Sequence, residues 1–257
     1  MKEYRFILSG YTRRSNKGVH ILNISLDKPE MDGLNSKDTI GSGPDNREEI
    51  SYMSLVDSDV RDHSRLLLNI EDPSYMALDA DKLFVLSSRD EGGVKAYNFD
   101  RNREGLRPIG GVDMLGKAPC HLFFDRDKSL IYASNYHLGR LDILFLNEDG
   151  LSLAGSICLE GRGPISPNQD GPRCHMAIKD PSDRFTIVVN LGGDRVETYY
   201  IDTEGYDLVS SYHTRPGMGP RHMVFGPGGR HVYLMGELDS TVEVLAYDNA
   251  KGTLRSI

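Results

Sequence analysis

Three histidines, two arginines and one glutamate stand at corresponding places in repeated segments of this chain. They are His121, His175, His222, Arg173, Arg221 and Glu237. Histidine and glutamate often move protons in catalysis, and arginine binds carboxylate or phosphate through a fork of parallel N–H donors. If the fold brings these side chains together, they could activate water or move a proton on a small anionic molecule.

These residues belong to a short phrase that occurs four times in the chain. The four copies begin at Pro73, Pro119, Pro172 and Pro220, which are 46, 53 and 48 residues apart. A histidine follows the proline in the last three copies, and Tyr75 takes its place in the first. Self-similarity at this spacing indicates a repeat fold.

Two short apolar segments follow each copy of the phrase, as in 130–136 and 141–146. The first segment is nearly unbroken in its apolar character, which predicts a strand buried on both faces. The second alternates, which predicts a strand with one solvent-exposed side. Three or four such strands in each radial repeat predict an all-β fold, a β-propeller forming a single domain over residues 1–257.

The topology of a propeller blade predicts where the polar residues meet. The first strand lines the central channel and the second runs antiparallel to it, so the start of one and the end of the other share a mouth of the channel. The side chains expected at that mouth are His121, Asn135, Tyr136, Arg173, His175, Asn190, Arg221, His222 and Glu237. The alternative is that each residue caps a strand, and that Arg221 and Glu237 form an ordinary structural ion pair.

Composition narrows the range of functions. The net charge of -8 argues against nucleic acid or an anionic membrane as a partner, although clustered arginines could still bind a small anion. No apolar run has the length of a membrane span, and residues 1–11 lack the apolar core of a signal peptide. The chain has three cysteines, and an odd number argues against a framework of disulfides. We interpret them as small buried residues of a protein in a reducing compartment. We therefore expect a cytoplasmic protein.

Residues 27–63 form an irregular, polar excursion in which at most one or two short strands are expected. The remainder holds about five units of blade length, so the predicted ring is incomplete. We expect this sequence to be part of a longer one, since an incomplete ring leaves a bare strand edge. That edge could also be closed by a second chain, through self-association.

The phrase around Arg221 and the segment 236–242 resemble the sequence signature of the seven-bladed propeller lactonases, a family that includes bacterial 6-phosphogluconolactonases and carboxy-muconate cyclases. Segments 10–12, 18–19, 119–121 and 134–136, together with His175, are similar to the family's other motifs. Two positions depart from the family pattern, because Gly236 replaces the usual asparagine and Asn190 stands where an aspartate is common. The resemblance implies that the last two of seven blades are absent from this sequence.

The resemblance also implies the roles of particular residues. His175, Arg221 and Glu237 would be catalytic, and the residues expected to bind substrate are His121, Asn135, Tyr136, Arg173 and His222. The expected reaction is hydrolysis of a small anionic sugar-acid lactone, most simply 6-phosphogluconolactone in the pentose phosphate pathway, without a metal or cofactor. Two alternatives are a carboxy-muconate-type cycloisomerase and a non-catalytic propeller that serves as a binding scaffold.

Overall fold

The computed structural model describes residues 2–10, 12, 17–26, 64–87, 92–113 and 116–257, and their regular structure consists of strands. The first sheet has three strands, β1 (Lys2–Leu8), β2 (Gly18–Leu26) and β3 (Ser64–Asn69). The second and third sheets contain β4 (Met76–Asp79), β5 (Lys82–Ser87), β6 (Gly93–Asp100), β7 (Gly105–Asp113), β8 (His121–Asp125), β9 (Leu130–Asn135), β10 (Arg140–Asn147) and β11 (Gly150–Cys158). The fourth and fifth contain β12 (Cys174–Lys179), β13 (Thr186–Asn190), β14 (Arg195–Ile201), β15 (Tyr206–His213), β16 (Pro220–Phe225), β17 (His231–Gly236), β18 (Thr241–Asp248) and β19 (Thr253–Ser256).

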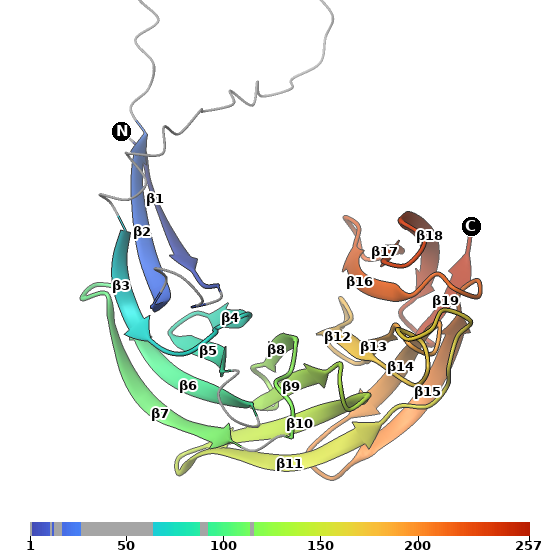
Figure 1. Ribbon diagram of the computed structural model, residues 1–257, viewed down its shortest axis with the longest axis horizontal. Helices are drawn as coiled ribbons and strands as arrows, with labels where there is room; N and C mark the ends of the chain where they lie inside the picture. Colours follow the sequence, from blue (N-terminus) through green and yellow to red (C-terminus); the bar gives the residue numbers. More distant parts are fainter. Residues whose placement is uncertain (1, 11, 13–16, 27–63, 88–91, 114–115) are drawn as a thin grey trace, which may run out of the picture.

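Every sheet is antiparallel, and its strands lie side by side in sequence order. The sheets follow one another along an arc, with β4, β8, β12 and β16 toward its concave side and β7, β11 and β15 on its convex side (Figure 1). Four four-stranded sheets and one three-stranded sheet confirm the predicted β-propeller with about five blades. The predicted excursion at 27–63 lies outside the described residues, and the described part contains no helix that could span a membrane.

The hydrophobic core consists of separate layers between neighbouring sheets. Phe84 and Leu86 of β5 pack with Leu122, Ile131 and Ala133 of the next sheet, and equivalent layers lie at the other junctions. Burying one large apolar side chain contributes about 1.5–3 kcal/mol. The contacts between sheets, which the apolar second strand of each repeat supplies, therefore stabilise the arc.

The third strands of the central blades differ from the sequence prediction. The alternation of apolar and polar residues predicted one solvent-exposed side, but β10 and β14 are buried along most of their length. Their buried carboxylates are hydrogen-bonded inside the protein, because Asp142 accepts a hydrogen bond from Ser156 Oγ (2.6 Å) and Glu197 accepts one from Tyr199 Oη (2.9 Å). The alternation of apolar and polar residues in β10 and β14 therefore reflects polar groups that are buried between two sheets and hydrogen-bonded there, and not a strand face in contact with water.

The last sheet, β16–β19, packs on its neighbour through one face only. On its other face lie Val224, Tyr233, Met235 and Val242, residues that are 59%, 44%, 41% and 62% exposed. The expectation of continuous burial holds for β5, β9 and β13 but is wrong for β17, whose residues are alternately exposed and buried. The reason is that none of the described residues covers the second face of this sheet.

Candidate active site

The starts of the inner strands bring the histidines together, as the blade topology predicted. His121 is the first residue of β8, and His175 and His222 lie near the starts of β12 and β16. The ring centroids of His175 and His222 are 5.0 Å apart, and those of His121 and His222 are 6.4 Å apart. Tyr75 and Tyr136 extend this cluster, with centroids 4.7 Å from His121 and 5.8 Å from His175 respectively. The histidines come from three successive blades and Tyr75 from the blade before them, so four blades contribute to one aromatic cluster.

Two of the site residues occupy irregularities in the strand pairing. The register of β12 with β13 shifts between Cys174 and Met176, so His175 is the extra residue there. The register of β16 with β17 shifts between Pro220 and His222, which makes Arg221 the extra residue. A β-bulge turns a side chain away from the regular alternation of a strand, and bulges often occur beside functional sites. The two bulges allow consecutive residues such as Arg221 and His222 to reach the same site.

Arg221 and Glu237 form an ion pair within this site. The distance between Arg221 Nη1 and Glu237 Oε2 is 2.6 Å, and the side chains are 39% and 31% exposed. Glu237 directly follows β17, and its backbone N–H donates to the carbonyl oxygen of Gly219 (2.9 Å). A guanidinium group has five N–H donors, so Arg221 keeps donors for a second anion while it binds Glu237.

These groups border a cavity of about 630 Å³. Its lining residues are Ser74, Tyr75, Lys117, Ala118, Pro119, Cys120, Tyr136, His137, His175, Arg221, His222 and Glu237. Lys117 and His137 were not among the site residues expected from the sequence. Lys117 lies shortly before Pro119 and His137 shortly after Asn135, each within three residues of a repeated motif. This closeness to the motifs is the sequence feature that could have identified them as site residues.

Four of the expected residues do not line the cavity. His121 is buried behind it, and Asn135 and Asn190 are fully buried and bind backbone groups. The side chain of Asn135 donates to Lys117 O (2.8 Å) and accepts from Leu138 N (3.2 Å). Arg173 lies over the Tyr136 ring at 5.4 Å and donates to His137 O. Asn135 and Arg173 thus bind the backbone of two lining residues, Lys117 and His137, whereas the backbone partners of Asn190 do not line the cavity.

Burial keeps the imidazoles of the cluster neutral. It lowers the pKa of His121 to about 3, an effect that the neighbouring His222 and His175 increase. Burial followed by the charge of Arg221 lowers the pKa of His175 to about 4, and the same causes lower the pKa of His222, against the opposite effect of Glu237. Burial also raises the pKa of the Cys120 thiol to about 12, so this cysteine is not a nucleophile at neutral pH. Neutral imidazoles can donate one hydrogen bond each and accept another.

We expect the free energy of unfolding to decrease as the pH falls from 6.5 toward 3. In this interval the unfolded chain binds protons at His121 and His175, whose folded-state pKa values are about 3 and about 4, so acid favours unfolding. The loss should be on the order of a few kcal/mol in total, since one pKa unit corresponds to about 1.4 kcal/mol. Urea denaturation at several pH values would measure it.

The matched variants are His121→Gln and His231→Gln, because His231 is exposed on β17. His121→Gln should weaken the dependence of unfolding free energy on pH, and His231→Gln should leave it as in the unmodified protein. Equal pH dependence in the two variants would contradict the assignment to His121.

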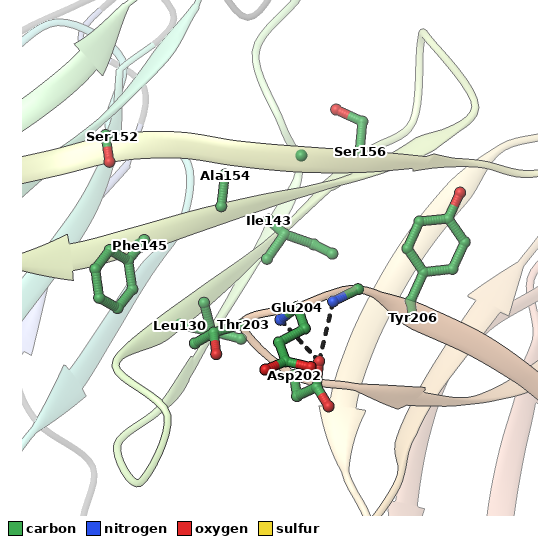
Figure 2. Close-up of a pocket in the computed structure, with 12 residues that line it drawn as sticks. Leu130, Ile143, Phe145, Ser152, Ala154, Ser156, Asp202, Thr203, Glu204 and Tyr206 are labelled. Carbon is green, nitrogen blue, oxygen red and sulfur yellow. Dashed lines mark hydrogen bonds between the residues drawn. The ribbon is translucent and has the colours of Figure 1, made fainter.

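A second cavity, of about 390 Å³, lies between two blades and away from this site (Figure 2). Leu130, Ile143 and Phe145 line one side of it, and the turn that begins at Asp202 lies opposite. The Asp202 carboxylate accepts hydrogen bonds from the backbone of Glu204 and Gly205 (2.8 and 2.9 Å), so it serves its own turn. Among the described residues, no arginine, lysine or histidine lines this cavity. It therefore lacks the cationic and imidazole groups that line the cavity at the channel mouth.

The fold and the site define a β-propeller with an arginine, histidine and glutamate cluster at one mouth of its channel. The chain belongs to the family described as lactonase, 7-bladed beta-propeller, whose model matches residues 39–257. Among the described residues, no three histidine, cysteine, aspartate or glutamate side chains are arranged to hold a metal ion.

Three similar proteins illustrate the relationship. An uncharacterized protein of Lactococcus lactis is 30% identical over 256 residues, which are 98% of this chain and 65% of that protein. The 6-phosphogluconolactonase of Bacillus subtilis is 30% identical over 198 residues, 75% of this chain and 56% of the enzyme. A crystal structure of a Lactobacillus plantarum protein superposes with a TM-score of 0.79 at 25% identity, covering 100% of this chain and 66% of that one. This chain thus spans less than two thirds of the length of the curated relatives it matches.

Proposed function

We propose that this protein hydrolyses the ring ester of an anionic sugar-acid lactone, with 6-phosphogluconolactone as its substrate. The observation that carries the proposal is the Arg221–Glu237 ion pair, which borders the channel-mouth cavity beside His175 and His222. Membership of the lactonase family and the similarity to a 6-phosphogluconolactonase support the choice of reaction and substrate.

The positively charged side chains of the cavity have a role in substrate binding. Arg221 and Lys117 are the cations that line it, and they bind the phosphate of the substrate. Arg173 was expected to share this role, but it lies outside the cavity lining, and Lys117 takes its place in the proposal. The arrangement should favour a phosphorylated lactone over a neutral one.

The hydrolytic step needs one base and one hydrogen-bond donor. The oxygen of a water molecule attacks the lactone carbonyl carbon, and the Glu237 carboxylate accepts the proton released from that water. A neutral imidazole, His175 or His222, donates a hydrogen bond to the oxyanion that forms, with the Tyr136 hydroxyl as an alternative donor. The ring C–O bond then breaks, and its oxygen receives the proton from Glu237 to give the hydroxy acid.

Freshly generated 6-phosphogluconolactone should be hydrolysed faster in the presence of this protein than spontaneously. The value of kcat/KM should exceed that for unphosphorylated gluconolactone by about 10-fold or more, since a hydrogen bond to a charged group contributes about 1.5–3 kcal/mol. Acid release measured against the spontaneous rate would check both values.

Equal rates with and without protein, together with measurable binding of 6-phosphogluconate, would favour the non-catalytic scaffold. Conversion of a carboxylated muconate without lactone hydrolysis would favour the cycloisomerase.

A further inference from the structure

We infer that Asp194 is a positioning residue that holds both members of the Arg221–Glu237 ion pair in place. Asp194 lies in the turn between β13 and β14, directly before β14, and is only 7% exposed. It does not line the channel-mouth cavity. The expected effect of Asp194 on turnover rests on the proposed function, but its effect on the geometry of the ion pair does not.

Both carboxylate oxygens of Asp194 bind the segment that leads to Arg221. Oδ2 accepts a hydrogen bond from the backbone N–H of Gly217 (2.7 Å), and Oδ1 accepts one from that of Gly219 (2.9 Å). Hydrogen bonds from backbone N–H groups to a carboxylate are charge-assisted, and burial strengthens them. Asp194 therefore fixes the chain two residues before Arg221.

The same segment fixes Glu237 from its other side. The carbonyl oxygen of Gly219 accepts from Glu237 N (2.9 Å), and that of Met218 accepts from Leu238 N (3.1 Å). Gly219 has a φ of +59°, and a Cβ at this position would approach the Leu238 side chain to 2.5 Å. The conformation and the Leu238 side chain therefore favour glycine here, and the peptide groups of Gly219 join Asp194 to both partners of the ion pair.

The long connection between β11 and β12 is attached to the same carboxylate. Gln169 is completely buried, and its Nε2 donates to Asp194 Oδ1 (2.7 Å) and to Leu191 O (2.9 Å). Its Oε1 accepts from Ile165 N (3.2 Å), which anchors the connection itself. The connection between β11 and β12, which lies in the longest interval between repeats, thus supplies a further hydrogen-bond donor to Asp194.

Asp180 provides a matched control for a purely structural effect. It is 1% exposed and lies at the other end of the same blade, in the turn that follows β12. Its Oδ1 accepts hydrogen bonds from the backbone of Arg184 (3.0 Å) and Phe185 (2.7 Å). Asp180 thus binds backbone as Asp194 does, but it does not bind the segment that carries Arg221.

The experiment compares Asp194→Asn with Asp180→Asn. An asparagine turns one acceptor into an NH₂ group that faces a backbone donor, so both variants should be less stable. Only Asp194→Asn should lengthen the distance from Arg221 to Glu237 in a crystal structure and lower kcat/KM for 6-phosphogluconolactone, by about 10- to 100-fold. Combined with Arg221→Ala, it should cause a smaller loss than it does alone, because part of its effect acts through Arg221 and only the part that acts through Glu237 remains.

An ion pair unchanged at 2.6 Å in Asp194→Asn would overturn the inference, whatever the turnover. The same conclusion would follow if Asp180→Asn lowered kcat/KM equally, or if the effects of Asp194→Asn and Arg221→Ala were additive. Absence of lactonase activity in the unmodified protein would refute the proposed function, while the crystal structures would still decide the role of Asp194.

If Asp194→Asn does not fold, the variant Gln169→Met provides a second test, because it retains the Asp194 carboxylate and removes one of its hydrogen-bond donors. It should displace the pair by a smaller amount, and an undisplaced pair would again overturn the inference.

Discussion

Replacing Glu237 with glutamine should abolish most of the proposed lactone hydrolysis, lowering kcat by about 10²- to 10⁴-fold, the usual contribution of a positioned base. Glutamine keeps the size and hydrogen-bonding shape of the side chain but cannot accept a proton from water at neutral pH. The effect should therefore appear in kcat more than in KM. Initial rates at saturating 6-phosphogluconolactone, corrected for spontaneous hydrolysis, measure it.

Glu243→Gln is the matched control for this substitution. Glu243 lies on β18 of the same sheet and accepts a hydrogen bond from Tyr212 Oη (2.6 Å), but it does not line the cavity. Turnover in Glu243→Gln should equal that of the unmodified protein. If Glu237→Gln retained full kcat, Glu237 would not be the base, and His175 would become the first residue to test in its place.

Arg221→Ala should raise KM for the phosphorylated lactone and lower kcat/KM by about 10²-fold or more. It removes the charge-assisted hydrogen bonds that are proposed to hold the substrate, and it also leaves Glu237 without its ion-pair partner. Arg221→Lys should recover only part of this loss, because an ammonium group cannot reproduce the fork of the guanidinium. Michaelis–Menten kinetics with phosphorylated and unphosphorylated lactones separate the two contributions.

Arg215→Ala provides the corresponding control. Arg215 pairs with Asp239 through Nε at 2.7 Å, is mostly exposed and is not a cavity residue. An exposed ion pair contributes at most about 1 kcal/mol to stability, so neither kinetics nor folding should change much. A KM that rises for both lactones equally in Arg221→Ala would show that Arg221 does not bind the phosphate.

The fold could be predicted from the sequence because each repeated segment must meet the same packing requirement. Each unit needs one fully apolar strand to pack against both neighbours, and that requirement is visible in segments such as 130–136. The meeting of His175, Arg221 and Glu237 was also predictable, since it follows from which ends of adjacent antiparallel strands share an edge.

The finer arrangement of the site depends on contacts that no periodicity reveals. The bulges at His175 and Arg221 change which way these side chains point, and a bulge has no fixed sequence pattern. Asn135 and Asn190 have the polarity of substrate-binding residues, yet each finds backbone partners inside the blade. Asp194 lies outside every repeated motif of the site, so only its hydrogen bonds to Gly217 and Gly219 indicate its importance.

The exposed face of the β16–β19 sheet also has a kinetic consequence. In a row of blades, each unit is held by its neighbours, and a unit with one covered face opens more readily than one packed on both faces. Arg221, His222 and Glu237 all belong to this sheet or directly follow one of its strands, whereas His175 lies in the better protected sheet before it. On heating, local opening of the β16–β19 sheet would separate the ion pair from His175 while the central blades are still folded. For a protein that consists of residues 1–257, the proposed activity would then be lost at a lower temperature than the bulk of the β-structure.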